Sequence, residues 1–352
     1  MSNFAAQLRD LSVNIRLGKI CDYKAAVETV KYLRKFIAQT KFSNFREIIE
    51  VVRFEGAKLQ SADRTEFIIG NMVLSVLKMI REEALSSEAL EKFAYLALEP
   101  VRCGTVEDVK LFRSAVVDTL GEFLQELETS QELMADKLVE KITRSKNCNS
   151  ILICGSGCSV AEMALRRAAQ SNRKLQTLIF DSQADKSAST MVKNLQTEGE
   201  LGPKLQRCRA VELSKLRAQF ENSKIQMVIL APKMVSAQGA IVGPAGSVGA
   251  CLLAREFEVP VICPLSFYKL APTFLSTSIP WAFAKIKCSA DLVPFSEGQL
   301  VESACVYNVE LDCVPADLAT TFITQAGDCT PSAIPQLLGE YYHPADVKNW
   351  RF

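Results

Sequence analysis

The 352-residue sequence contains a single histidine, and this scarcity excludes several kinds of chemistry. A nucleophile activated by histidine would have to use His343, which lies near the end of the sequence and has no G-x-S-x-G partner motif. Zinc sites built from cysteine and histidine need closely spaced ligand pairs, yet the sequence has neither a C-x2-C nor an H-x3-H pair. We therefore expect neither a histidine-based nucleophile nor a metal site.

An excess of one charge is also missing, since 41 basic residues are balanced by 40 acidic ones. Such a balance gives no general attraction to nucleic acid or to an anionic membrane. No apolar run approaches the roughly 18 residues of a membrane span. With 48% hydrophobic and 23% charged residues, the composition is that of a soluble globular protein without direct nucleic-acid or membrane partners.

The twelve cysteines are scattered singly along the chain, and the first ten residues lack the apolar core of a secretory signal. Several cysteines, such as Cys154 and Cys263, lie in apolar, strand-like runs. A free thiol in such a run behaves as a small hydrophobic side chain. The pattern indicates a reducing cytosol rather than a disulfide framework.

Two different patterns of apolar residues divide the chain. Up to residue 147 these residues recur at helical spacing, and between residues 109 and 142 they form one stripe of a long helix. Asn44 is placed to cap a helix that begins near Phe45. From residue 148 short apolar runs alternate with helical patterns, as in a parallel sheet covered on both faces. The strands expected there are 151–154, 177–180, 209–213, 227–230, 259–263 and 306–314.

The sequence therefore predicts an α/β protein of two domains. Residues 1–147 are expected to form an N-terminal all-helical bundle domain. Residues 148–352 are expected to form a Rossmann-like, doubly wound, mostly parallel sheet domain. Proline and aromatic residues near the C-terminus, among them Tyr342 and Trp350, indicate a final segment that docks onto the protein.

The predicted long helix carries Asp118, Glu122 and Glu126 on its outer face. Carboxylates four residues apart on a helix repel one another. The row is either a solvated helix face or a surface that meets a basic partner, and the spacing alone leaves both interpretations open.

Glycines follow the first expected strand at Gly155 and Gly157. Such a turn lets backbone N–H groups approach an anion at a helix N-terminus. The dinucleotide-binding fingerprint, however, requires a small residue where Val160 stands. We expect a structural turn or the remnant of an anion loop, with no bound cofactor.

A second glycine cluster follows the strand expected at 227–230 and includes Gly239 and Gly246. Ser247 is placed to cap the helix that comes next. The charged side chain nearby is Lys233, and one lysine on a loop is more commonly solvated than catalytic. Cys158, at the start of an earlier helix, has no acid or base beside it in the sequence and is expected to pack rather than to react.

The order of these parts, together with the segment VILAPKMVSAQGAIVGPAGSVGACLLAREFEVPVICP, resembles one superfamily. It joins methylthioribose-1-phosphate and ribose-1,5-bisphosphate isomerases to the alpha, beta and delta subunits of translation initiation factor 2B. The stretches KFSNFREIIEVVRFEGAKLQ and LVPFSEGQLVESACVYNVELDCVPADL are similar to its beta-subunit branch. The isomerases carry a catalytic cysteine, a catalytic aspartate and an asparagine–lysine pair on the phosphate side. At these positions the resemblance places Gly155, Lys233, Gly243 and Pro244.

The resemblance implies a non-catalytic regulatory subunit of the cytosolic guanine-nucleotide exchange complex that acts on translation initiation factor 2. The implied partners are the alpha, gamma, delta and epsilon subunits of factor 2B, in a heterodecamer, and the alpha subunit of factor 2. The resemblance assigns Asp118 and Glu122 to contact with that alpha subunit, whose phosphorylation the complex senses. It assigns Asn149 and Ile151 to contacts between subunits, and Gly155, Gly157, Gly239, Gly246 and Ser247 to a vestigial anion loop.

Two alternatives stay open at this point. A divergent sugar-phosphate isomerase would need Cys154 or Cys158 in place of the missing thiol and another carboxylate in place of the aspartate. A sugar-phosphate or nucleotide sensor would use the glycine loops for binding alone.

Overall fold

The computed structural model describes residues 9–11, 13–14, 20–61, 66–85, 106–144, 149–155, 159–170, 175–181, 187–197, 207–275 and 286–350. The chain divides into two compact units, Met1–Thr129 with Gln336–Phe352, and Ser130–Pro335. This division differs from the expected boundary between residues 147 and 148. The reason is that the C-terminal segment packs with the helical unit, while the second half of the long helix packs with the sheet.

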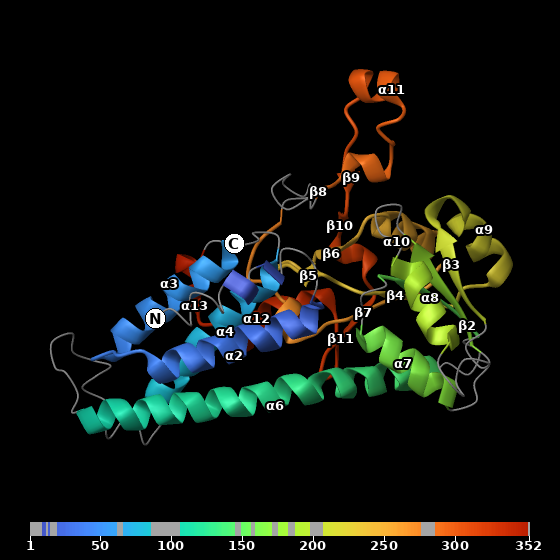
Figure 1. Ribbon diagram of the computed structural model, residues 1–352. Coiled ribbons are helices and arrows are strands. Elements are labelled where there is room, and N and C mark those ends of the chain that lie inside the picture. The colour runs from blue at the N-terminus through green and yellow to red at the C-terminus, as the bar shows by residue number, and fades with distance from the viewer. Residues whose placement is uncertain are drawn as a thin grey trace. The chain divides into compact units, whose positions relative to one another are not determined.

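In the described residues of the first unit all regular secondary structure is helical (Figure 1). Its helix α4 is apolar around most of its circumference, so all side chains from Phe67 to Leu77 are buried. Helices α2 and α3 pack against α4 and share its core. The helices of this unit are α2 (Asp22–Gln39), α3 (Phe45–Gln60), α4 (Phe67–Leu85), the first part of α6 (Val106–Arg144), most of α12 (Ile334–Tyr341) and α13 (Pro344–Asn349).

Two local predictions for the helices are confirmed. The side chain of Asn44 caps α3, because its Oδ1 accepts a hydrogen bond of 2.8 Å from the backbone N–H of Glu47. The long helix α6 exists, and its apolar stripe is buried at Phe112, Val116, Leu120, Phe123, Leu127, Met134, Leu138 and Ile142. The recurrence of apolar residues mostly every three or four positions was therefore enough to predict this helix.

The C-terminal segment docks within the first unit, as its composition predicted. Asp346 of α13 is fully buried and accepts hydrogen bonds from Arg53 Nη2 at 2.7 Å and from Arg81 Nε at 2.6 Å. Trp350 lies against Gly56 of α3, where a Cβ atom would come within 3.2 Å of the indole ring. A charged anchor and an aromatic contact thus hold α13 on α3 and α4.

The second unit is built on a seven-stranded sheet in the order β12-β11-β7-β4-β1-β2-β3. Six strands are parallel and the edge strand β12 is antiparallel. The chain runs outward from β1 through β2 and β3, and then returns to the other side of β1 with β4, which is the doubly wound arrangement. The strands are β1 (Ser150–Cys154), β2 (Gln176–Asp181), β3 (Cys208–Glu212), β4 (Met227–Leu230), β7 (Val261–Pro264), β11 (Thr321–Ile323) and β12 (Asp328–Cys329).

Helices cover this sheet on both faces. Ile151 and Ile153 point into one core with Leu138 of α6 and with residues of α7 and α8. Phe180 and Leu230 point to the other face, toward the start of α10. The helices around the sheet are the second part of α6, α7 (Ser159–Gln170), α8 (Ser187–Thr197), α9 (Leu213–Ser223) and α10 (Ser247–Glu256). A short α11 (Gly298–Ser303) and four 3-10 turns, η2 (Phe267–Lys269), η3 (Ser289–Asp291), η4 (Ala316–Leu318) and η5 (Pro331–Ala333), complete the helical elements described.

The strand expected at 306–314 does not join the parallel sheet, and this prediction was wrong. It forms β9 (Asn308–Val309), which pairs with β8 (Ile286–Lys287), and β10 (Leu311–Val314), which joins β5 (Met234–Val235) and β6 (Ile241–Pro244) in a small antiparallel sheet. The middle residues of β10 are only half-buried, which suits a strand with one covered face. The place beside β7 is taken by β11, which the sequence analysis missed.

All nine cysteines in the described ranges are free thiols. Across the same ranges, no helix combines the length and the apolar composition needed to cross a membrane.

Candidate functional site

The predicted anion loop lies at the carboxyl ends of β1 and β4, the neighbouring strands where the chain changes direction across the sheet. Ligands of open α/β sheets bind at this switch point. Gly155 directly follows β1 and adopts φ +107°, a conformation that favours glycine. Ala231, which follows β4, donates a backbone hydrogen bond of 2.8 Å to the carbonyl of Cys154 and holds the two strand ends together.

The space beside Gly155 is closed. A Cβ atom on Gly155 would lie 2.8 Å from the Cβ of Ala231 and 3.4 Å from the ring of Pro244. Both distances involve atoms fixed close to the backbone, so a side chain at Gly155 would require the strand ends to separate. In the isomerases that this sequence resembles, a catalytic cysteine occupies the position of Gly155. Here even the Cβ atom of such a side chain would lie too close to Ala231.

An internal carboxylate occupies the anion position of the second glycine loop. Asp312 on β10 lies opposite Gly243 of β6, and its Oδ2 accepts backbone hydrogen bonds from Gly246 at 3.0 Å and from Val248 at 3.2 Å. These N–H groups form the first turn of α10, where an anion is stabilised by the free donors and by the helix dipole. The free backbone donors of this loop are therefore satisfied by Asp312, a side chain of the same chain. Sequence analysis missed Asp312, although the acidic residues Glu310 and Asp312 inside the strand-like run at 306–314 were a usable signal.

Gly246 is required by the geometry of this turn. It adopts φ +93°, and a Cβ atom there would lie 2.5 Å from Cζ of Phe180. The prediction that Ser247 caps α10 was wrong, because Gly246 holds the cap position and the Ser247 side chain makes no capping hydrogen bond. Its Oγ is buried and lies 3.1 Å from where a Cβ of Gly243 would be. The capping acceptor is instead Asp312, which lies on the strand β10.

The thiols around this site are poor nucleophiles. Burial raises the pKa of the Cys154 thiol well above its usual value, and the neighbouring Cys251 raises it further. Burial, followed by the charge of Asp312, raises the pKa of Cys251 to about 12. A thiol must ionise to attack, so Cys154 is unsuited to replace the missing catalytic cysteine. Cys158 and Gly157 lie outside the described residues.

The remaining loop positions are structural. Gly239 adopts φ +83° and lies against Pro331, so that a Cβ atom on Gly239 would come within 3.2 Å of the proline Cβ. Lys233, which the resemblance placed at the isomerase aspartate, is half-buried, and its backbone N–H donates to the carbonyl of Val242 at 2.8 Å. Lys269 is buried and donates from Nζ to the carbonyl of Pro232 at 2.8 Å. In the described part of the chain, no three side chains of the usual ligand types gather as a metal site would require.

The acidic row is exposed on α6. Asp118 and Glu122 are both exposed and, among the described residues, neither has a hydrogen-bond or ion-pair partner. Beside them, Arg34 of α2 donates to the carbonyl of Val117 at 2.9 Å, and its guanidinium lies against Gly121. Because Gly121 has no side chain, Arg34 fits against it and helps to pack α2 on α6. This arginine therefore does not pair with Asp118 or Glu122, whose carboxylates face solvent.

The two residues assigned to subunit contacts differ in exposure. Asn149 is exposed, and its backbone N–H donates to Gln226 Oε1 at 2.6 Å. Ile151 is fully buried within the core of the second unit. Its side chain therefore supports the strand from inside, and an accessible contact at this place involves Asn149.

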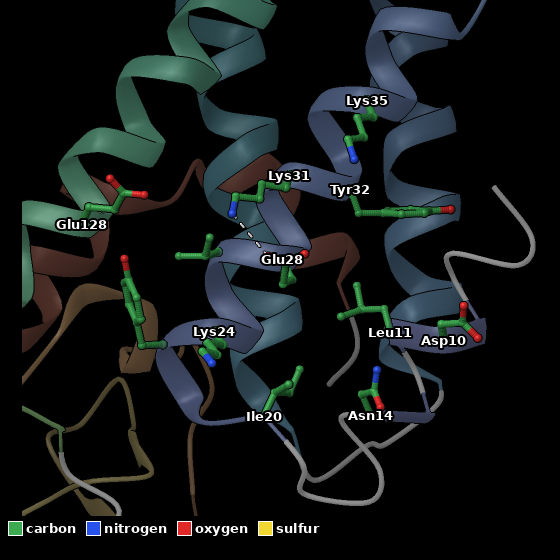
Figure 2. A pocket seen from close by; sticks show the side chains of 12 residues that line it. Asp10, Leu11, Asn14, Ile20, Lys24, Glu28, Lys31, Tyr32, Lys35 and Glu128 are labelled. Carbon is green, nitrogen blue, oxygen red and sulfur yellow. Dashed lines mark hydrogen bonds and ion pairs between the residues drawn. The ribbon is translucent and has the colours of Figure 1, made fainter. Parts of the chain in front are cut away.

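A cleft of about 660 Å³ opens in the first unit along α2 (Figure 2). Lys24, Lys31 and Lys35 follow one another along one side of this helix, and Lys31 pairs with Glu28 at 3.3 Å. Three acidic side chains balance the three lysines, so the cleft has no net attraction for an ion of either sign. Its lining consists of Asp10, Leu11, Asn14, Ile20, Tyr23, Lys24, Val27, Glu28, Lys31, Tyr32, Lys35 and Glu128.

Comparison with known proteins agrees with this arrangement of parts. The sequence profile of the initiation factor 2 subunit family matches residues 20–331, which is most of the chain. The chain belongs to the initiation factor 2 subunit family. It is 23% identical to translation initiation factor eIF2B subunit beta of Dictyostelium discoideum, with 92% of each chain covered. It is also 21% identical to ribose 1,5-bisphosphate isomerase of Archaeoglobus fulgidus, over 72% of this chain and 76% of the isomerase.

Solved structures show the same fold. The crystal structure of eIF2B beta from Chaetomium thermophilum matches with a TM-score of 0.68 at 22% identity, covering 98% of this chain and 94% of that one. A chain of the tetrameric eIF2B-beta2-delta2 complex from the same organism matches with a TM-score of 0.67 at 20% identity, covering 96% of this chain and 95% of that one. The α/β fold class, with a helical part followed by a mostly parallel sheet, is thereby confirmed.

Proposed function

We propose that the chain is a non-catalytic regulatory subunit, of the beta type, in the guanine-nucleotide exchange complex that acts on translation initiation factor 2. The proposal rests on one observation: residues of the chain itself take up the positions at the switch point where a ligand would bind. Gly155 has no room for a nucleophile, and Asp312 takes the place of a phosphate at α10. A fold that retains an isomerase framework and fills its ligand site with its own side chains suits a scaffold. The family membership and the likeness to beta subunits support the same conclusion.

The proposal includes a set of partners. The chain assembles in the cytosol with the alpha, gamma, delta and epsilon subunits of factor 2B into a heterodecamer, and it uses no cofactor. The exposed Asn149 at the start of β1 lies at a contact between subunits. Purifying the chain with these neighbours and measuring nucleotide release from factor 2 tests the assignment. Failure to assemble, or release that does not depend on the chain, would contradict it.

The acidic row is proposed as the surface for the alpha subunit of factor 2. Asp118 and Glu122 are exposed, four residues apart, and lack ion-pair partners among the described residues. Their mutual repulsion is relieved when a basic surface docks, which also speeds and orients the approach. A phosphate added to the partner brings negative charge toward this row and changes how the partner docks. This gives the regulatory subunit a physical means to sense phosphorylation.

Charge reversal tests this surface. We expect Asp118→Lys with Glu122→Lys to lower the association rate with the alpha subunit of factor 2 by about tenfold or more at low salt, with a smaller effect at high salt. Glu50→Lys is the matched control, because Glu50 is an exposed helical carboxylate on a different helix, α3. Equal effects of the control and the double variant would refute the assignment of the row.

A further inference from the structure

An arm, defined here as residues 286–310, stands out from the sheet of the second unit with α11 at its tip (Figure 1). The arm begins with β8, passes through η3 and α11, and returns with β9. Its large apolar side chains face solvent. Phe295 is 73% exposed and Ile286 is 50% exposed, and Leu292 and Tyr307 are exposed as well. A soluble chain rarely gathers four such side chains on one projecting segment unless they meet another surface.

The arm receives little support from its own chain. Strands β8 and β9 contain two residues each and form two register pairs, Ile286 with Val309 and Lys287 with Asn308. Among the arm side chains whose burial is described, Asn308 alone is buried, and its Nδ2 donates to the carbonyl of Cys288 at 2.9 Å. A two-stranded ribbon of this length is marginal in water by itself. The apolar residues of the arm therefore contribute to no core within the described chain.

The charges of the arm indicate what kind of partner surface it can bind. Lys287 pairs with Glu310 at 3.5 Å near the base. Asp291, Glu297 and Glu302 are exposed and have no ion-pair partner among the described residues. The tip thus combines apolar side chains with an uncompensated negative charge. It fits an apolar recess bordered by lysine or arginine, and two such tips would repel each other.

We infer that the arm is an assembly element that inserts into a delta-type subunit of the same complex, with Phe295 as its anchor. This inference rests on the proposed function. Two observations select the occupant. A chain that this one matches over 96% of its length was solved in a tetrameric eIF2B-beta2-delta2 complex, which contains delta subunits. The acidic tip disfavours contact with the arm of a second copy of this chain.

The test measures binding of the full chain to the delta-type subunit from the same source. We expect Phe295→Asp to weaken this binding by about thirtyfold or more, as loss of an aromatic anchor does, while thermal unfolding of the isolated chain stays unchanged because Phe295 is exposed. The control is Phe54→Asp, which alters a phenylalanine of similar exposure on α3 and should leave binding within about threefold of wild type. As a second readout, amides of residues 286–310 should gain protection from hydrogen exchange when the complex forms.

The outcomes separate the two proposals. If the wild-type chain does not bind the delta-type subunit, the proposed function fails and this inference fails with it. If the wild type binds and Phe295→Asp binds equally well, with no protection of the arm, the arm inference alone is overturned. It is also overturned if Phe295→Asp abolishes only self-association of the chain and leaves delta binding intact.

Discussion

Removing the carboxylate of Asp346 should detach the C-terminal segment from the helical unit. Asp346 is fully buried and accepts hydrogen bonds from two arginines, Arg53 at 2.7 Å and Arg81 at 2.6 and 2.9 Å. In Asp346→Ala both guanidinium groups lose their counter-ion while remaining partly enclosed, with side chains 25% and 19% exposed. Breaking a buried ion pair by removing one partner costs about 3–5 kcal/mol. The residual exposure of the arginines places the expected loss near the lower end, about 3 kcal/mol.

Urea unfolding followed by the fluorescence of Trp350 measures this loss locally. Trp350 is buried at the end of α13, and replacing Trp281 by phenylalanine leaves it as the only tryptophan of the chain. With an m-value of about 2 kcal/mol/M, the midpoint should fall by about 1.5 M. Asp328→Ala is the control, because Asp328 forms an exposed ion pair with Lys141 that is worth about 1 kcal/mol or less. Equal shifts for the two variants would refute the reasoning.

The same anchor predicts a pH dependence. Burial by itself would raise the pKa of Asp346, but hydrogen bonds and charge from Arg81 and Arg53 outweigh burial and lower the pKa below its ordinary value. Since the pKa is lower in the folded state, the carboxylate stabilises the segment fully above the unfolded value of about 4. This contribution should disappear as the pH falls through the folded-state pKa. In Asp346→Asn the unfolding midpoint should change less between pH 5 and acid than in the wild type.

Three further predictions concern the switch point. Asp312→Ala should destabilise the second unit by about 1–2 kcal/mol in urea unfolding, because the first turn of α10 loses its acceptor; an unchanged midpoint would contradict the capping role. Gly246→Ala should cost about 2–4 kcal/mol, since it combines a left-handed backbone with a clash against Phe180, and near-wild-type stability would show that the turn relaxes easily. Cys251, with its pKa raised to about 12, should stay unlabelled by a thiol reagent at pH 8 while the exposed Cys288 reacts, as peptide-resolved mass spectrometry can show; rapid labelling of Cys251 would contradict its burial.

Local sequence patterns were enough to predict the helices, caps and strands that depend on neighbouring residues. The apolar stripe of α6 and the cap at Asn44 depend on residues within one or a few turns, so spacing and residue type determined them. Continuous apolar runs likewise identified β1, β2 and β4 as strands covered on both faces. The lack of a nucleophile at Gly155 was also visible in the sequence, because it is a statement about which side chain is present.

Tertiary structure decided what lies together across long separations. The hydrogen bonds of Asp312 to α10 and of Asp346 to Arg81 join residues 66 and 265 positions apart, and no local pattern encodes such pairs. Apolar alternation at 306–314 fitted several sheets equally well, so only the packing of β10 on β6 revealed the antiparallel pairing. By itself the sequence determined the order of a helical part followed by a mostly parallel sheet. The fold decided that the anion site is filled by an internal carboxylate, because that depends on which strand lies opposite Gly243.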